Sequence, residues 1–101
     1  MNIFDIYLEK INLVVQKLKN DKVLEVPDKL TGLNVDIPSS KFNCDISSNV
    51  AMLLSKPNNK SPIEIGKIIA ETLKKEDDSI NEIDVVKPGF INIKFKNTFW
   101  S

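Results

Sequence analysis

The chain begins with a helical pattern of apolar positions. Apolar side chains recur at the i, i+3, i+4 spacing that places residues on one face of a helix. The residues in this pattern are Phe4, Tyr7, Ile11, Val14, Val15 and Leu18. The spacing predicts an amphipathic helix from Ile3 to about Leu18, which Asn20-Asp21 ends.

Two short extended segments are predicted next. Residues 23–26 are mainly apolar and predict a strand that ends at Pro27. Residues 33–37 alternate apolar and polar side chains and predict a second strand that ends at Pro38. Proline ends both because it cannot donate a ladder hydrogen bond. Residues 39–44 show no periodicity and are predicted to form a loop.

The middle of the chain predicts two helices. The first is short, from about Ser47 to Leu54, and we expect Lys56-Pro57-Asn58-Asn59 to break it. The second has a clear start in Ser61-Pro62-Ile63-Glu64, with a Ser cap, Pro at the first helical position and Glu where a capping box places it. It should run to about Lys75. Gly66 within it predicts a close contact between helix and sheet.

The last two predicted strands cover residues 80–86 and 90–96 and are joined by Lys87-Pro88-Gly89, which is tight enough for an antiparallel hairpin. The order is therefore helix, two strands, one or two helices, two strands. It predicts an α+β two-layer sandwich, with helices on one face of a four-stranded, mainly antiparallel sheet. At 101 residues the chain fits one domain, with a core from about residue 2 to 96.

The last strand carries the most informative alternation. One face is apolar and is predicted to lie in the core: Ile91, Ile93 and Phe95. The other face combines an aromatic ring, an amide and two ammonium groups: Phe90, Asn92, Lys94 and Lys96. This second set suits an unpaired RNA base, which can stack on the ring and hydrogen-bond to the amide while lysines neutralise phosphates. It also fits a structural alternative in which the ring covers a sheet edge, the amide bonds to a loop and the lysines solubilise the face.

Charge and composition narrow the possible functions. Fourteen basic residues balance fourteen acidic ones, and every basic residue is Lys, so no cationic stripe is available to grip nucleic acid by charge alone. Histidine is absent and Cys44 is the only cysteine, which removes the commonest general base, a thiolate metal cluster and an intramolecular disulfide. We interpret Glu76-Asp77-Asp78 as a solvated turn rather than a metal site.

Nothing in the sequence predicts secretion or a membrane anchor. The start, Met1 to Asp5, carries an acidic residue where a secretory signal carries positive charge, and no apolar run approaches the roughly 20 residues of a membrane span. We therefore expect a cytoplasmic protein.

Three segments resemble one known family. Pro88-Gly89-Phe90-Ile91-Asn92 resembles the Pro-Gly-Phe/Tyr-Ile/Leu-Asn signature that closes the N-terminal additional domain of arginyl-tRNA synthetases. Asn43 to Met52 is similar to that family's His-Gly-Asp-Tyr-x-Ser/Thr-Asn-x-Ala segment, with matches at Asp45, Asn49 and Ala51, but Asn43 and Cys44 replace the usual His and Gly. Ser61 to Gly66 resembles its Pro-x-Glu-Ile-Ala helix opening. Together the segments cover about the last two-thirds of the chain.

The resemblance implies an α-β(2)-α-β(2) fold and a domain that reaches the elbow of tRNA(Arg), where Phe90 and Asn92 would contact a D-loop base. Pro88 and Gly89 would set the turn that aims them, and we interpret Asp45 and Asn49 as structural groups that start a helix or bond to a loop. The implied partners are tRNA(Arg) and the catalytic domain of the same chain, with no DNA or membrane. ATP and Mg would serve that catalytic domain, because this stretch lacks the His-Ile-Gly-His and Lys-Met-Ser-Lys-Ser motifs of class I synthetases.

Two other hypotheses stay open from the sequence. Residues 89–95 superficially echo the RNP1 strand of an RRM, although Ile91 and Asn92 do not fit that motif and the chain begins with a helix instead of a strand. The chain could also be a freestanding protein-interaction domain that uses Phe90, Phe99 and Trp100 as exposed anchors.

Overall fold

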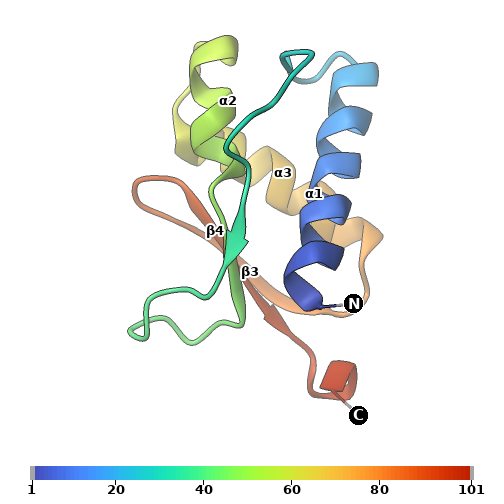
Figure 1. The fold of residues 1–101 in the computed structure, drawn as a ribbon, viewed down its shortest axis with the longest axis vertical. Coiled ribbons are helices and arrows are strands. Elements are labelled where there is room, and N and C mark those ends of the chain that lie inside the picture. The colour runs from blue at the N-terminus through green and yellow to red at the C-terminus, as the bar shows by residue number, and fades with distance from the viewer. Residues whose placement is uncertain (1, 101) are drawn as a thin grey trace.

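A computed structural model describes residues 2–100, which form three α-helices, a four-stranded sheet and a short 3-10 helix (Figure 1). The helices are α1 (Ile3–Asn20), α2 (Val50–Asn58) and α3 (Pro62–Glu76), and the 3-10 helix is η1 (Asn97–Trp100). The strands are β1 (Val35–Asp36), β2 (Ile46–Ser48), β3 (Ile80–Val86) and β4 (Phe90–Phe95). The sheet order is β1-β2-β4-β3, and each neighbouring pair is antiparallel. The predicted α+β class is confirmed.

Capping groups begin the two long helices. Asn2 Oδ1 accepts a hydrogen bond from the Asp5 amide at 2.9 Å, and Ser61 Oγ accepts one from the Glu64 amide at 3.1 Å. Each bond satisfies one of the backbone donors that a helix leaves unpaired in its first turn. The start predicted for α3 at Ser61-Pro62 is therefore confirmed.

The helices pack on one face of the sheet, with α3 between α1 and α2 (Figure 1). The three core residues predicted in the last strand are buried there, since Ile91 and Ile93 are 0% exposed and Phe95 is 2% exposed. The predicted close contact at Gly66 is also present, because a Cβ on Gly66 would lie 2.6 Å from Val85 Cγ1. The absence of a side chain at Gly66 therefore lets α3 approach β3 closely.

The first predicted strand is wrong. Residues 23–26 lie in no strand, although Leu24 and Val26 are buried. The backbone between them bonds to a side chain instead of a neighbouring strand: Asn58 Oδ1 accepts from the Glu25 amide at 2.7 Å, and Asn58 Nδ2 donates to the Glu25 carbonyl at 2.9 Å. The second predicted strand, residues 33–37, is reduced to the two residues of β1.

The predicted short helix is also misplaced. Its expected first residues form β2, which pairs with β1 on one side and β4 on the other, and α2 starts only at Val50. At its other end α2 continues through Pro57, which was expected to break it, and stops at Asn59, whose φ of 51° is left-handed. The helix tolerates Pro57 in its last turn, where Asn58 Nδ2 donates to the Leu54 carbonyl at 2.8 Å.

The acidic turn after α3 is only partly solvated, which corrects the prediction for Glu76-Asp77-Asp78. Asp77 is 7% exposed, and its Oδ2 accepts hydrogen bonds from the Tyr7 hydroxyl at 2.6 Å and Lys10 Nζ at 3.1 Å. Its Oδ1 accepts from the Ser79 amide at 2.9 Å. Asp77 therefore joins α1 to the turn before β3.

Within residues 2–100, no helix combines the length and the apolar character needed to cross a bilayer.

Candidate nucleic-acid interface

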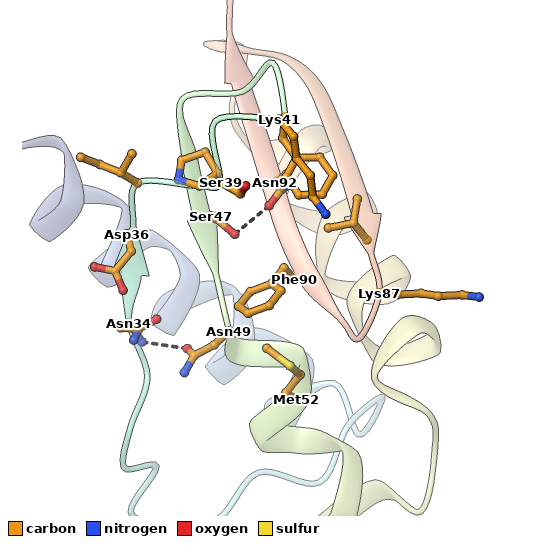
Figure 2. Close-up of a pocket in the computed structure, with 14 residues that line it drawn as sticks. Asn34, Asp36, Ser39, Lys41, Ser47, Asn49, Met52, Lys87, Phe90 and Asn92 are labelled. Atoms are coloured by element: carbon orange, nitrogen blue, oxygen red, sulfur yellow. Dashed lines mark hydrogen bonds between the residues drawn. The ribbon is translucent and has the colours of Figure 1, made fainter.

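The face of the sheet opposite the helices carries a cavity of about 680 Å³ (Figure 2). Loop 37–42 folds back over this face and encloses the cavity together with β2, β4 and the start of α2. The lining residues are Asn34, Asp36, Ile37, Pro38, Ser39, Lys41, Phe42, Ser47, Asn49, Met52, Val86, Lys87, Phe90 and Asn92. A cavity of this size lies in the range of small-molecule sites.

Phe90 lies at the start of β4, where it borders the cavity and is 39% exposed. The turn before it requires Gly89, which has a φ of 154° and whose added Cβ would overlap the Cβ of Pro62 at the start of α3. Gly89 thus lets the hairpin rest on α3 and holds Phe90 beside the cavity. An accessible ring in this position offers a stacking surface.

Asn92 lines the same cavity but is only 5% exposed, whereas the sequence predicted an open, outward-facing amide. Loop 37–42 covers it, which strand alternation alone could not reveal. Its Oδ1 accepts a hydrogen bond from Ser47 Oγ at 2.7 Å (Figure 2). Among residues 2–100 no hydrogen bond is found for its Nδ2, and every fully buried side-chain nitrogen or oxygen there has a partner. The Asn92 Nδ2 group is therefore accessible as a donor.

The two lysines predicted beside Phe90 and Asn92 do not line the cavity. Lys94 shares their face, but its Nζ donates to Asn43 Oδ1 at 3.2 Å. Lys96 follows the end of β4 and is exposed. The structure thus brings Phe90 and Asn92 together without either lysine.

Two other lysines do border the cavity, and the sequence reasoning missed both. Lys41 belongs to the covering loop, with its Nζ 5.1 Å from the centre of the Phe42 ring. Lys87 stands directly before Pro88, and Figure 2 shows its side chain directed away from the other lining residues. The position of Lys87 beside the Pro-Gly turn was a usable signal, but loop 37–42 offers no periodicity from which Lys41 could have been placed.

Ser47, Met52 and Phe42 were also missed as lining residues. Ser47 could have been found by alternation had residues 46–48 been recognised as a strand, since residue 47 then shares a face with Asn92. The other two depend on tertiary packing of α2 and the loop.

Asp45 and Asn49 hold the backbone around the cavity. Asp45 precedes β2, and its Oδ2 accepts a hydrogen bond from the Phe95 amide at 2.8 Å, so its side chain binds the end of β4 instead of starting a helix. Asn49 Oδ1 accepts from the Asn34 amide at 2.9 Å, and its Nδ2 donates to the Gly32 carbonyl at 2.8 Å. Asn49 thereby ties the start of α2 to the segment before β1.

Cys44, next to Asp45, is half-buried. Burial raises the pKa of the Cys44 thiol, and the nearby carboxylates of Asp45 and Asp84 raise it further. The protonated thiol is therefore favoured, and it is a weak nucleophile. Among the residues that the structure describes, no group of three His, Cys, Asp or Glu side chains could hold a metal ion.

One anchor of the protein-interaction hypothesis is partly covered. Phe99 is half-buried, and its ring stacks on Phe95 with centroids 4.3 Å apart. The side chain of Trp100 lies outside the part of the chain that the structure describes. Phe90 alone of the three aromatic residues is shown to be exposed.

The fold and the cavity define a class of protein: a small α+β domain whose sheet is covered by helices on one face and carries a ligand-sized cavity on the other. Residues 5–95 match the family described as the arginyl tRNA synthetase N terminal domain. The chain belongs to this family, and the RRM hypothesis is set aside.

Relatives of the chain carry the same family's name. An arginine–tRNA ligase of Pelagibacter ubique (strain HTCC1062) is 58% identical over 101 residues, covering 100% of this chain and 18% of that protein. An arginine–tRNA ligase of Parvibaculum lavamentivorans is 34% identical, covering 99% of this chain and 17% of that protein. One of Mycoplasma mobile is 38% identical, covering 87% and 17%. The chain thus spans less than a fifth of the length of these relatives.

Proposed function

We propose that this chain is the tRNA-recognising N-terminal domain of a cytoplasmic arginine–tRNA ligase and that its cavity receives one D-loop base at the elbow of tRNA(Arg). The remainder of the enzyme would attach arginine with ATP and Mg. The chain would act through binding, holding the tRNA while the catalytic domain performs the chemistry.

The observation that carries the proposal is the pairing of Phe90 and Asn92 at one cavity on the helix-free face. Phe90 offers an exposed aromatic ring, and Asn92 offers an amide donor beside it. RNA-binding modules commonly recognise a base that has left its stack by combining an aromatic platform with a hydrogen bond to the base edge. The family membership supplies the class of RNA.

Two lysines near the cavity could bind the phosphates of the RNA backbone. Lys41 and Lys87 lie on different segments that border the cavity, so each could approach a phosphate beside an inserted base. Asp36 also borders it, so the local charge is mixed. Recognition would therefore depend on shape and stacking more than on charge.

The test is steady-state charging of tRNA(Arg) by the full-length enzyme. Stacking contributes roughly 1–3 kcal/mol per base, so Phe90→Ala should lower kcat/KM for tRNA by about 5- to 100-fold. Asn92→Ala should reduce the penalty for charging tRNA with a substituted D-loop base. The KM values for ATP and arginine should not change, because the cavity would contact only tRNA.

Leu13→Ala provides a matched control. Leu13 is also an exposed apolar residue, at 61% exposure, but it lies on α1 and does not line the cavity. It should leave tRNA charging unchanged. Unaltered kcat/KM for tRNA in both Phe90→Ala and Asn92→Ala would refute the site.

A further inference from the structure

Ser47 stands beside Asn92 at the centre of the cavity wall. The two residues are direct partners across the β2–β4 pair, and Ser47 Oγ donates to Asn92 Oδ1 at 2.7 Å. Both line the cavity (Figure 2). The position of Ser47 is the unspecified x in the segment that resembles His-Gly-Asp-Tyr-x-Ser/Thr-Asn-x-Ala, so the motif itself gives this residue no role.

The orientation of the Asn92 amide decides which bases it can select. The two ends of a carboxamide have nearly the same shape, but the oxygen only accepts hydrogen bonds and the nitrogen only donates them. A rotation of the amide by half a turn would therefore exchange donor for acceptor. In this structure Ser47 Oγ donates to the amide oxygen, and Nδ2 has no hydrogen bond among residues 2–100. A hydroxyl can also accept, so Ser47 can bond to either end of the amide, and its effect is to hold one end against the cavity wall while the other end stays free.

We propose that Ser47 is a positioning residue that holds the Asn92 carboxamide in place, with one end bonded to Ser47 and the other end free for a nucleobase. With the Asn92 nitrogen free, as in this structure, the site selects a base that presents an acceptor, a ring nitrogen or a carbonyl oxygen, at the edge facing Asn92. This inference rests on the proposed function, since it concerns selectivity among bases at the same cavity. Ser47 need not touch the RNA to have this effect.

The experiment compares charging of unaltered tRNA(Arg) with charging of transcripts in which each D-loop base is replaced in turn, all with the full-length enzyme. The readout is the ratio of kcat/KM values, which is the discrimination. Ser47→Ala should reduce the largest of these ratios by about three- to tenfold, the range of one neutral hydrogen bond. Ser47→Thr keeps the hydroxyl and should restore the ratio.

Ser40→Ala is the matched control. Ser40 is an exposed serine of loop 37–42 that does not line the cavity, so its loss should leave the ratio unchanged. A purely structural role for Ser47 would lower kcat/KM for all transcripts alike and would leave the ratio intact. That outcome would overturn the proposal.

Asn92→Asp gives a second test that does not depend on Ser47 variants folding well. It keeps the side-chain shape but removes the donor, so discrimination should fall as far as in Asn92→Ala. Adding Ser47→Ala to Asn92→Ala should cause no further loss, because the two residues act through one interaction. Retained discrimination in Asn92→Asp would show that Asn92 acts as an acceptor and would overturn the proposal.

Phe90→Ala separates this inference from the proposed function. If Phe90→Ala impairs charging while Ser47→Ala leaves discrimination intact, the cavity binds tRNA and only the role of Ser47 is wrong. If neither Phe90→Ala nor Asn92→Ala affects charging, both proposals fail together.

Discussion

Asp77 is buried, whereas its sequence neighbours Glu76 and Asp78 are exposed. Burial alone would raise its pKa, but hydrogen bonds from Tyr7, from the Ser79 amide and from Lys10 outweigh that effect and hold the pKa below its usual range. A carboxyl whose pKa is lower in the folded state stabilises the fold above its unfolded pKa of about 3.9 and loses that contribution as the pH falls further. Its contribution should therefore be complete at neutral pH.

Asp77→Asn should lower the free energy of unfolding by about 1–3 kcal/mol at neutral pH, because it weakens charge-assisted hydrogen bonds to a buried group. It should also flatten the loss of stability below about pH 4, since the titrating group is gone. Urea denaturation of the 101-residue chain at several pH values measures both effects. Asp78→Asn, at the exposed neighbouring position, is the control and should keep the acid dependence of the wild type. An equal acid dependence in both variants would contradict the assignment.

At the scale of elements, the sequence predicted what local patterns determine. The face of α1, the start of α3 and the β3–β4 hairpin follow from periodicity, capping residues and the Pro-Gly turn. The sequence did not predict β2, because three residues are too few to show an alternation of apolar and polar positions. This strand is defined by its pairing with β1 and β4. The strand predicted for residues 23–26 is wrong because Asn58, distant in sequence, supplies the hydrogen bonds there.

The site was predictable to a similar extent. Alternation and the Pro-Gly motif placed Phe90 and Asn92 on one face of the last strand, and both line the cavity. Lys94 and Lys96, which the same alternation assigned to this face, do not line the cavity, because alternation gives the face of a residue but not its distance along the strand from the cavity. The cover formed by loop 37–42 could not be predicted, since it depends on the tertiary path of a segment without periodicity.

Gly66→Ala tests the contact between α3 and β3. Alanine is the better helix former by about 1 kcal/mol. Its Cβ would nevertheless lie 2.6 Å from Val85 Cγ1, so we expect overpacking to dominate and a net destabilisation of about 1–2 kcal/mol in urea denaturation. The double variant Gly66→Ala/Val85→Ala should lose less free energy of unfolding than the sum of the losses in the two single variants. Stabilisation by Gly66→Ala alone would contradict this packing.

Gly89→Ala tests the hairpin that positions Phe90. Alanine is strained at a φ of 154° and would overlap Pro62, so the hairpin should move away from α3. We expect lower stability and, in the full-length enzyme, a loss of tRNA kcat/KM approaching that of Phe90→Ala. Gly32→Ala is a useful control, because Gly32 also has a positive φ but does not line the cavity. Normal charging by a stable Gly89→Ala enzyme would argue against a positioning role.

At the scale of the whole molecule, the helical layer supports one face of the sheet while the other face carries the cavity (Figure 1). The chain has a formal net charge of zero, so binding to RNA should release few counterions. The domain should consequently bind tRNA weakly in isolation and contribute selectivity within a larger enzyme.

The salt dependence of binding by the 101-residue chain measures this property. With only Lys41 and Lys87 at the cavity, the slope of log K against log salt should have a magnitude of about 1–2. Lys87→Ala should reduce that magnitude by about 1, whereas Lys67→Ala, an exposed lysine on α3, should not change it. Fluorescence anisotropy with labelled tRNA(Arg) over a range of KCl concentrations gives the slopes. A slope of about 6 or more would indicate a charge-driven interface that this structure does not contain.

Chemical-shift mapping of the isotopically labelled chain during titration with tRNA(Arg) tests directly whether tRNA binds at the cavity. We expect the largest changes at Phe90, at the Asn92 side-chain amide and at the Met52 methyl group, which all border the cavity. Leu13 and Lys67, on the helical side, should be unaffected. Changes confined to α1 and α3, with no shift of the signals from the cavity residues, would contradict binding of tRNA at the cavity.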